Sequence, residues 1–474
     1  MGLTGTLLFA IIVTCCGSGF QHGYNGGVVN APQSTIESWM MQVLAPNEVI
    51  MKNTTRYDEL KYQTTLLYST LVSLYCLGGM VGGFMTNLWS NIFGRKGGIM
   101  ANNIFIFISA ILMGFSKTFN SIVMLIVGRF IVGINNGLNA GLVPMYLSEI
   151  PPIALRGGVG SMYQLLITIS ILLSQIISNE SVLGTKEYWP LALAFIIIPA
   201  VLQILLLPFC ADSPRYLQEQ QRDEDVKKAL LWFRQDENVQ EEVDLLKAES
   251  EAEKQIGKVN MSDLFTVKTL RTPLIISCFI MAAQQFSGIN AVIFYSTSTF
   301  ESAKLSQTTA QNGTILIGLM NVFMTVISTA IVDKAGRKTL LVIGFGSMVF
   351  DTAILCVCLV LALSYDSTLF AYAAILFVVL YVVFFAVGPG SIPWLLVSEL
   401  FLQNARQQGA SIAVAVNWLS NFIVSLFFPT LQNLLKAYVF LIFVVLQTIF
   451  VIFIIVKVPE TKNRSVKDIV AEFE

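Results

Sequence analysis

The chain has 474 residues, of which 55% are hydrophobic and 12% are charged, and its formal net charge is −1. Soluble domains carry about 25% charged residues, so this composition excludes a soluble globular protein and indicates a chain that crosses a membrane many times. The near-zero net charge gives no indication of nucleic-acid binding. The seven cysteines fall in apolar stretches, which argues against a disulfide framework or a metal site. We therefore expect no metal and no cofactor.

Twelve segments are long and apolar enough to cross a bilayer, which takes about 20 residues. The first segment lacks a basic leader and a clear cleavage site, so we expect it to be retained as a span rather than removed as a signal peptide. The predicted fold class is an all-α polytopic membrane protein with 12 transmembrane helices in two six-helix halves. The predicted spans are residues 5–29, 65–87, 97–115, 120–143, 157–179, 188–210, 272–297, 311–332, 338–362, 369–394, 408–430 and 436–457.

A polar segment, residues 211–271, separates spans six and seven and holds ten of the 29 Lys and Arg residues. Its central part, Glu224 to Gln255, has helical periodicity and many charge pairs, so we expect solvated helices there. The short loops on the same side of the predicted membrane are also basic, which places the insert and both termini in the cytoplasm. The predicted organisation is a first half at residues 1–210, a cytoplasmic insert at 211–271, a second half at 272–457 and a cytoplasmic tail at 458–474.

The first predicted loop, residues 30–64, then lies outside the cell. It contains the sequence Asn53-Thr54-Thr55, which is an N-glycosylation acceptor. We therefore predict glycosylation at Asn53 and favour the plasma membrane, although the sequence leaves an internal membrane open.

Two short motifs recur at equivalent places in both halves. Gly94-Arg95-Lys96 returns 242 residues later as Gly336-Arg337-Lys338, and Glu149 precedes Arg156 by seven residues as Glu399 precedes Arg406. Such a repeat indicates a duplicated six-span unit. Parallel repeats of this size are a transporter architecture, with the substrate bound between the halves near the middle of the membrane.

The charges of these motifs predict a cytoplasmic gate. Carboxylate–guanidinium pairs between the halves could hold that side shut, and partly exposed pairs are worth only about 0–1 kcal/mol each, so they can break when it opens. The alternative is that the arginines only anchor the topology, which does not explain the glutamates. The predicted gate residues are Arg95, Arg129, Glu149, Arg156, Asp333, Arg337, Glu399 and Arg406.

The predicted seventh span carries an unusual run of amides from Met281 to Ser296. Amides inside a membrane cost free energy unless they find partners, and they can donate to and accept from a neutral polyhydroxylated ligand. Gly288 within the run favours a break in the helix, which membranes tolerate where the helix lines a cavity. The alternative is that the amides bond helix to helix.

These motifs and several others together resemble the facilitative hexose transporters of the sugar-porter branch of the major facilitator superfamily. The resemblance covers about residues 10–465, and it implies a sugar bound in a central cavity that opens to each side in turn. Its further motifs are Gly128-Arg129-Phe130, Asp212-Ser213-Pro214-Arg215, Gln284-Gln285-Phe286-Ser287-Gly288-Ile289-Asn290, Gly388-Pro389-Gly390, Asn417-Trp418-Leu419-Ser420-Asn421 and Pro459-Glu460-Thr461-Lys462.

Carried over by motif position, the resemblance implies a set of amide side chains and one tryptophan around the sugar. Trp394 would stack on the sugar or close the cavity, and the break at Gly388-Pro389-Gly390 would serve as a hinge. The implied substrate-binding residues are Gln164, Gln284, Gln285, Asn290, Asn321, Trp394 and Asn421.

Two positions bear on substrate and energy source. Ala386 stands where glucose-selective relatives often carry a glutamate, whereas Trp394 is kept, so glucose is favoured and fructose remains an alternative. Asn25 stands where proton-coupled relatives carry a carboxylate, and an amide cannot take up and release a proton near neutral pH. We therefore predict a uniporter. We do not expect an enzyme, because the chain has a single histidine and no metal-ligand cluster or nucleophile–base pair with motif support. A proton–sugar symporter, a transporter of another solute such as urate, and a sensor with a transporter fold remain open, as does the oligomeric state.

Overall fold

The computed structural model describes residues 2–46, 55–152, 155–236, 238–255, 259, 261–332, 335–462, 464 and 468–469. The predicted glycosylation site Asn53 and the predicted gate residue Asp333 lie outside these residues. Every regular element of the described chain is helical.

The first half contains six helical passages. The first passage is continued through a π-helical turn, and the sixth is made of two shorter helices and a 3₁₀ turn. The elements are α1 (Gly5–Thr14), η1 (Cys15–Gly19), α2 (Phe20–Gly27), α3 (Gln33–Leu44), α4 (Thr55–Phe93), α5 (Arg95–Phe115), α6 (Ile122–Glu149), α7 (Arg156–Ile177), α8 (Trp189–Ala194), α9 (Ile197–Leu206) and η3 (Leu207–Phe209).

The second half repeats this plan with two interrupted helices. The elements of the insert are α10 (Pro214–Glu219), α11 (Asp223–Arg234), α12 (Gln240–Gln255) and α13 (Asp263–Thr266). Those of the second half are α14 (Lys268–Phe286), α15 (Ile289–Ser302), α16 (Gln307–Val332), α17 (Arg337–Tyr365), α18 (Thr368–Val387), α19 (Ile392–Glu399), α20 (Gln403–Leu435), η4 (Lys436–Tyr438) and α21 (Val439–Lys457).

Eleven stretches of the described chain are long and apolar enough to cross a membrane. The last stretch, Gln408–Lys457, is 50 residues long and contains both α20 and α21, so it makes two passages. The helices therefore cross twelve times, and the predicted fold class is confirmed. The helix boundaries extend several residues beyond many predicted spans because amphipathic turns continue past the apolar core of each helix.

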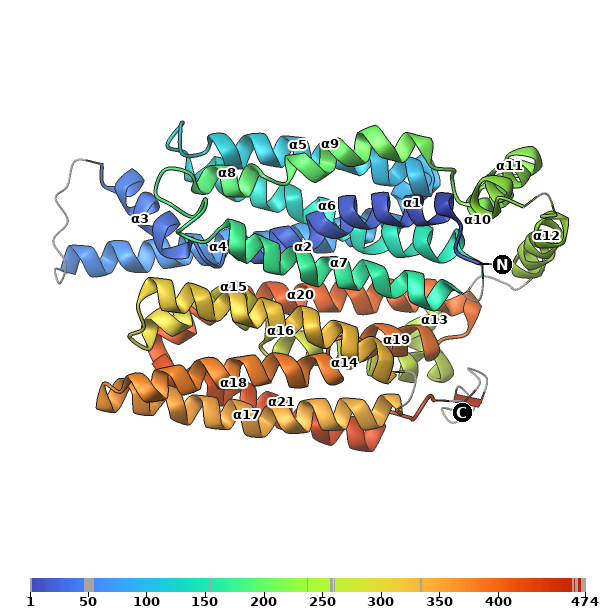
Figure 1. Ribbon diagram of the computed structural model, residues 1–474. Coiled ribbons are helices and arrows are strands. Elements are labelled where there is room, and N and C mark those ends of the chain that lie inside the picture. The colour runs from blue at the N-terminus through green and yellow to red at the C-terminus, as the bar shows by residue number, and fades with distance from the viewer. Residues whose placement is uncertain are drawn as a thin grey trace.

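The two halves lie side by side, with the first half and the second half forming separate groups of helices in Figure 1. Their apolar core is continuous, and it includes Tyr68 and Trp189 of the first half with Phe300 and Phe345 of the second. The halves meet along two helix pairs, α4 with α20 and α7 with α16. Within the first half, a Cβ on Gly133 would lie 2.1 Å from the Tyr75 carbonyl oxygen, so only glycine allows α6 to approach α4 so closely.

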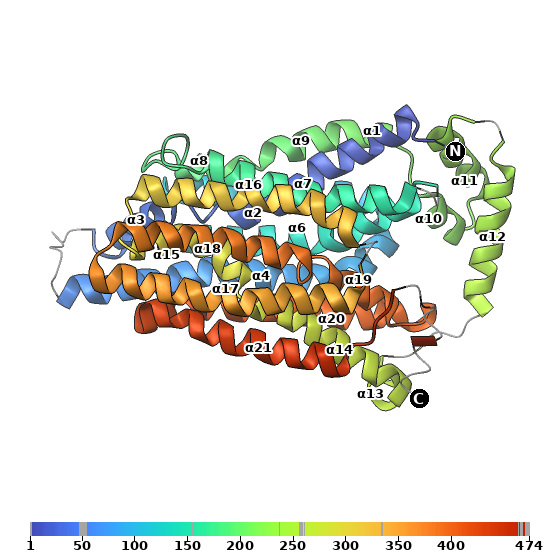
Figure 2. The same ribbon diagram turned by 60° about the horizontal axis from the view of Figure 1, so that its bottom comes forward.

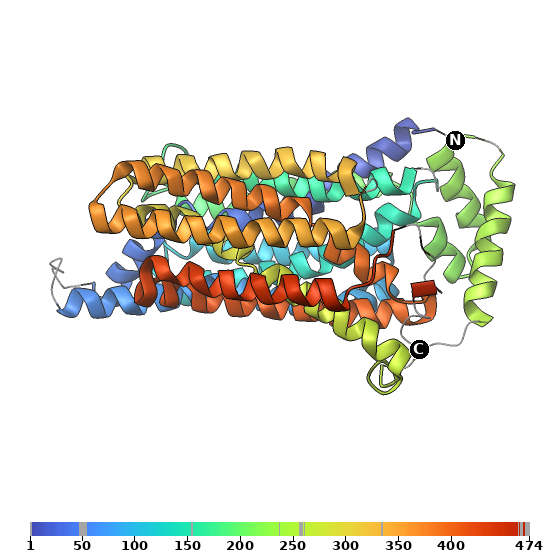
Figure 3. The same ribbon diagram turned by 90° about the horizontal axis from the view of Figure 1, so that it is seen from below.

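Both termini and the helices of the insert lie at one end of the molecule, which we call the insert end (Figure 1). The other end, which carries α3, is the far end. Seen from two further sides, α12 runs crosswise past the ends of the membrane-spanning helices at the insert end (Figures 2 and 3). The N-terminal segment is tied to the insert, because the hydroxyls of Thr4 and Thr6 donate to the backbone carbonyls of Phe233 and Trp232.

Two helix breaks fall where the sequence predicted them. The seventh passage breaks between α14 and α15, where Gly288 has a φ of +103° that disfavours residues with a side chain. The tenth passage breaks between α18 and α19 at the segment that begins with Gly388 and Pro389. Both breaks lie beside the amide residues that the sequence singled out.

Candidate functional site

The amides of the seventh passage form one hydrogen-bonded cluster with a side chain from the eleventh. The Asn417 amide nitrogen donates to the Gln284 Oε1 at 2.8 Å and to the Met281 carbonyl at 3.0 Å. The Gln285 Nε2 donates to Asn417 Oδ1 at 3.0 Å and to Gln284 Oε1 at 3.3 Å. We call Gln284, Gln285, Asn290 and Asn417 the amide cluster.

Gln284 also fixes the break in the tenth passage. Its Nε2 donates to the carbonyl oxygens of Pro389 and Gly390, both at 2.8 Å. Because its oxygen already accepts from Asn417 and Gln285, both donors and both acceptor positions of this amide are occupied by protein groups. In this conformation Gln284 therefore holds two broken helices together rather than offering a free amide to a ligand.

Asn290 joins the cluster from the other side of the Gly288 break. Its Nδ2 donates to Gln285 Oε1, so one hydrogen bond spans the interruption in the helix. Asn421 lies one turn after Asn417 on α20, and its Oδ1 accepts from the Ser425 hydroxyl at 3.1 Å. The structure thus brings Gln284, Gln285 and Asn290 together and places Asn421 on the neighbouring helix.

The other implied binding residues do not join the cluster. No hydrogen bond given for the described residues connects Gln164, Asn321 or Trp394 to it. Gln164 is exposed on α7, and Trp394 is 42% exposed at the start of α19. Asn321 is half-buried on α16, and its backbone carbonyl accepts from Thr325.

Sequence reasoning assigned no site role to four residues that contact the cluster or one another: Asn417, Trp418, His22 and Tyr163. Asn417 was noted in its motif but not assigned a role. Trp418, the next residue, lies with its ring centroid 6.4 Å from that of His22 in the first half. His22 Nδ1 in turn lies 2.9 Å from the Tyr163 hydroxyl. No local pattern around Asn417 and Trp418 indicates these contacts, because the contacts join helices that are far apart in the chain.

Arg129 does not belong to the insert-end gate, and this prediction was wrong. It lies 20 residues before Glu149 on α6, which corresponds to about 30 Å along a helix. Its guanidinium is fully buried, lies 4.5 Å from the centre of the Tyr75 ring, and donates to the Asn25 backbone carbonyl at 2.9 Å. The prediction grouped Arg129 with the gate residues as nearby in topology, although the predicted span, residues 120–143, already placed it well before Glu149.

The ion pairs of the repeated motifs form within each half or with the insert, not between the halves. In the first half, Arg95 pairs with Glu149 and with Glu219 of α10, both at 3.1 Å. Burial raises the pKa of the Glu219 carboxyl above its ordinary range, although the neighbouring Arg95 acts in the opposite direction. In the second half, Arg337 pairs with Glu399 at 3.2 Å.

None of the ion pairs seen among the described gate residues joins the two halves at the insert end, so these pairs do not form the predicted latch. The Thr461 hydroxyl completes the second pair by donating to Glu399 at 2.5 Å. Arg156 and Arg406 are exposed, and one Arg406 nitrogen lies 3.5 Å from the Phe401 carbonyl. The repeated motifs thus form the same local structure in both halves. In each half, a glutamate at the end of one helix pairs with the arginine at the start of another helix of that half.

The far end is closed across the halves by uncharged groups. Asn30 donates to the Ile293 carbonyl at 2.5 Å and to the Ser296 hydroxyl at 2.8 Å, and its oxygen accepts from the Thr297 backbone at 3.1 Å. Gln311 of the second half likewise bonds the Ala31 carbonyl and the Glu180 amide of the first half, at 3.0 and 3.1 Å.

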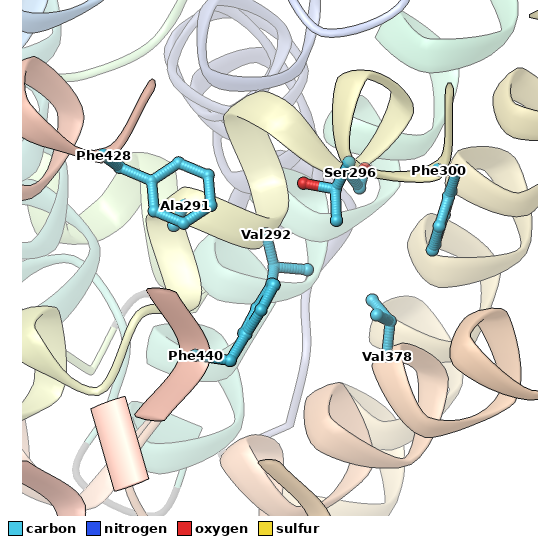
Figure 4. Close-up of a pocket in the computed structure, with 8 residues that line it drawn as sticks. Ala291, Val292, Ser296, Phe300, Val378, Phe428 and Phe440 are labelled. Carbon is cyan, nitrogen blue, oxygen red and sulfur yellow. The ribbon is translucent and has the colours of Figure 1, made fainter. Parts of the chain in front are cut away.

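A small pocket beyond the Gly288 break is a poor sugar site. Six of its eight lining residues are apolar, and Figure 4 shows aromatic rings of Phe300, Phe428 and Phe440 around it. The Ser296 hydroxyl on its wall is already bonded to Asn30. The amide cluster, not this pocket, has the chemistry to bind a neutral polar molecule.

The fold and the site define a class: a membrane transporter built from two six-helix halves, with uncharged polar groups at broken helices near the interface between them. A family described as "Sugar (and other) transporter" matches residues 10–473. The chain belongs to this family.

Curated relatives of high similarity match over the whole chain. The chain is 40% identical to "Solute carrier family 2, facilitated glucose transporter member 3" of Homo sapiens over 481 residues, which cover 100% of this chain and 93% of the relative. It is 41% identical to the protein of the same name from Oryctolagus cuniculus over 482 residues, with the same coverage.

Solved structures show the same architecture. The chain superposes on the "inward open conformation of the xylose transporter XylE from E. coli" with a TM-score of 0.79 at 25% identity, covering 98% of this chain and all of that one. A crystal structure titled "D-xylose-proton symporter" gives a TM-score of 0.74 at 25% identity, covering 97% and 99%.

Proposed function

We propose that this protein is a facilitative uniporter that moves a hexose, with glucose as the favoured substrate, across the plasma membrane by alternating access. The observation that carries this proposal is the amide cluster, which places uncharged donors and acceptors beside two helix breaks and the interface between the halves. The relatives named as facilitated glucose transporters support the same reading over the full length.

In this proposal the sugar contacts the side chains that the cluster leaves available. Gln285, Asn290 and Asn421 supply hydrogen bonds to the hydroxyls, whereas Gln284 positions the two broken helices. The resemblance also implies sugar contacts from Gln164, Asn321 and Trp394. For these three residues to reach the sugar, it must lie between the two halves rather than within the amide cluster.

The proposal also assigns an orientation. The insert end with both termini faces the cytoplasm, because the basic residues of the short loops and of the insert lie there. Since the far end is bonded across the halves and the ion pairs of the repeated motifs do not join the halves at the insert end, this conformation corresponds to a protein closed toward the outside. The insert-end charges then act as the gate that must rearrange when the cytoplasmic side closes.

A proton-coupled symporter is the second candidate, because a solved relative carries that name. The chemistry at Asn25 disfavours it. The Asn25 side chain donates to the Gln21 carbonyl at 2.7 Å, and the guanidinium of Arg129 donates to the backbone carbonyl of Asn25. An amide at this place cannot exchange a proton with the arginine beside it.

Reconstituted protein tests both candidates. Labelled D-glucose uptake into liposomes is measured with D-fructose and L-glucose as competitors, at equal pH on both sides and with a proton gradient. We expect stereospecific uptake that stops at equal concentrations. Accumulation driven by the gradient would replace the uniporter with a symporter, and preferential competition by D-fructose would change the substrate.

A further inference from the structure

One acidic side chain lies deep inside the second half without any partner. Asp351 is at the middle of α17 and is 3% exposed. Among the residues that the structure describes, it is the one Asp or Glu that is buried. Both of its carboxyl oxygens are inaccessible to water and have no hydrogen-bond partner.

No cation lies near enough to pair with this carboxyl. The two titratable groups that interact electrostatically with Asp351 are the Tyr381 hydroxyl of α18 and the Cys358 thiol of α17 itself. The basic residues of the helices packed against it sit at helix ends; Arg337, for example, is 14 residues away, or about 21 Å along the helix. The remaining titratable or charged groups of α17 and of its packing partners α18, α19, α21 and η4 are Lys338, Cys356, Tyr365, Tyr372, Glu399, Lys436, Tyr438 and Lys457.

An ionised carboxylate in this place is strongly unfavourable. The charge would lack both water and a partner, and the penalty for such a charge in a protein interior amounts to several kcal/mol. The carboxyl avoids that penalty by keeping its proton. Burial without a partner therefore favours the protonated, neutral form of Asp351.

The neighbours of Asp351 are connected to the break in the seventh passage. The Tyr381 hydroxyl donates to the Ser287 backbone carbonyl at 2.8 Å, and the Gln447 Nε2 donates to the same carbonyl at 2.9 Å. The Thr352 hydroxyl, next to Asp351, donates to Gln447 Oε1 at 3.2 Å. We call Thr352, Tyr381 and Gln447 the carbonyl clamp, because together they hold the carbonyl that directly precedes Gly288.

We propose that Asp351 is a proton-binding site whose occupancy sets the carbonyl clamp and, through it, the geometry of the sugar site. The proposal rests on the proposed function of the amide cluster, since Gln285 and Asn290 lie on the two sides of the break that the clamp holds.

The step is a simple acid dissociation. The O–H bond of the carboxyl breaks and its electron pair stays on the oxygen. Because both oxygens are closed off from water in this conformation, the proton passes to a water molecule that reaches Asp351 only when the surrounding helices move apart. The resulting carboxylate needs hydrogen-bond donors, and the hydroxyls of Tyr381 and Thr352 are nearby donors that already serve the clamp. Ionisation therefore competes with the Ser287 carbonyl for the Tyr381 hydroxyl and with Gln447 Oε1 for the Thr352 hydroxyl, and this competition loosens the break. A proton site away from the interface modulates transport without coupling it to a proton gradient.

The test compares the protein with Asp351→Asn, which mimics the protonated carboxyl in size and charge. Hexose exchange is measured at equal pH on both sides, from about pH 6 to about pH 8.5, a range in which exposed carboxyls stay ionised. We expect the KM of the unchanged protein to rise about three- to tenfold with pH, the effect of weakening one hydrogen bond to the Ser287 carbonyl. Asp351→Asn should keep the low-pH KM throughout, and Tyr381→Phe should have a raised KM with little pH dependence.

Asp366→Asn is the matched control, because Asp366 lies exposed just after the same helix and pairs with Lys304 at 2.7 Å. It should follow the pH profile of the unchanged protein. If Asp351→Asn follows that profile as well, the regulatory part of the proposal is overturned.

A second measurement separates this proposal from the proposed function. Infrared difference spectra between low and high pH should contain the carbonyl band of a protonated carboxyl, and that band should be absent from Asp351→Asn. The band is independent of hexose transport, so its presence supports the proton site even if the protein moves another solute. A spectrum unchanged by Asp351→Asn would refute the proton site.

Discussion

Replacing Asn417 by leucine tests whether the amide cluster determines hexose affinity. The substitution keeps the number and branching of the side-chain heavy atoms, although leucine is bulkier, and it removes the hydrogen bonds of Asn417 with Met281, Gln284 and Gln285. Leucine also suits the interior of α20, so the helix itself should be preserved. We expect hexose affinity to fall while the protein still folds and reaches the membrane.

The expected loss of hexose affinity depends on which hydrogen bonds Gln284 and Gln285 keep in the variant. Gln284 and Gln285 retain their mutual hydrogen bond at 3.3 Å, so neither side chain is left without any partner. A typical buried hydrogen bond contributes about 0.5–1.5 kcal/mol, which gives a net loss of roughly 1–3 kcal/mol for this site. At about 1.4 kcal/mol for each tenfold change, affinity should fall roughly five- to 100-fold.

The assay is hexose binding to purified protein, together with the KM of equilibrium exchange in liposomes. Asn433→Leu is the matched control, because Asn433 is exposed on the same helix. The control should bind hexose as the unchanged protein does. An affinity of Asn417→Leu within about twofold of the control, in protein of normal thermal stability, would refute the role of the cluster in binding, since a single lost hydrogen bond already exceeds that.

Three further substitutions examine the ends and the interface of the halves. Asn30→Ala removes three hydrogen bonds that cross the halves at the far end, so it should increase labelling of cysteines introduced on the outer side of the cavity. Glu149→Gln should lower the melting temperature more than Glu219→Gln. Burial raises the pKa of the Glu219 carboxyl, so the folded protein binds a proton there more tightly than the unfolded chain does. The stability contributed by Glu219 is therefore lost as the pH rises, and Glu219→Gln should be neutral or slightly stabilising. Gly79→Val should destabilise the interface by about 1–3 kcal/mol, because a Cβ at Gly79 would lie 2.5 Å from an indole carbon of Trp418 on α20. Its melting temperature should be lower than that of Gly83→Val, since a Cβ at Gly83 would lie 4.0 Å from the same indole.

The sequence predicted the elements whose signal is local. Runs of apolar residues marked the twelve passages, and Gly288 and Pro389 marked the two broken helices. The repeated motifs also identified charged residues that the structure brings together, Arg95 with Glu149 and Arg337 with Glu399. Each of these features depends on neighbours in the chain or on a comparison of the two halves.

The partners across the helix bundle could not be predicted in this way. The sequence treated Gln284 as a sugar ligand. In the structure its amide is occupied by the break between α18 and α19, by α20 and by its own helix. The sequence analysis also grouped Arg129 with the gate residues, whereas its guanidinium contacts Tyr75 and Asn25 of other helices. The role of Asn417 depends on the packing of α14 against α20, which no periodicity in either helix reveals.

The contrast between the two ends bears on how the halves move. Five hydrogen bonds from Asn30 and Gln311 close the far end, and at about 0.5–1.5 kcal/mol each they contribute only a few kcal/mol. The ion pairs of the repeated motifs at the insert end are already satisfied within each half or with the insert, so separating the halves there breaks none of the pairs described. Closing the insert end must then be favoured by new contacts, and the exposed Arg156 and Arg406 are the cations available to make them. Because the closure at the far end is weak and uncharged, a similarly modest gain at the insert end is enough to reverse the equilibrium, which is the balance that a carrier without an energy source requires.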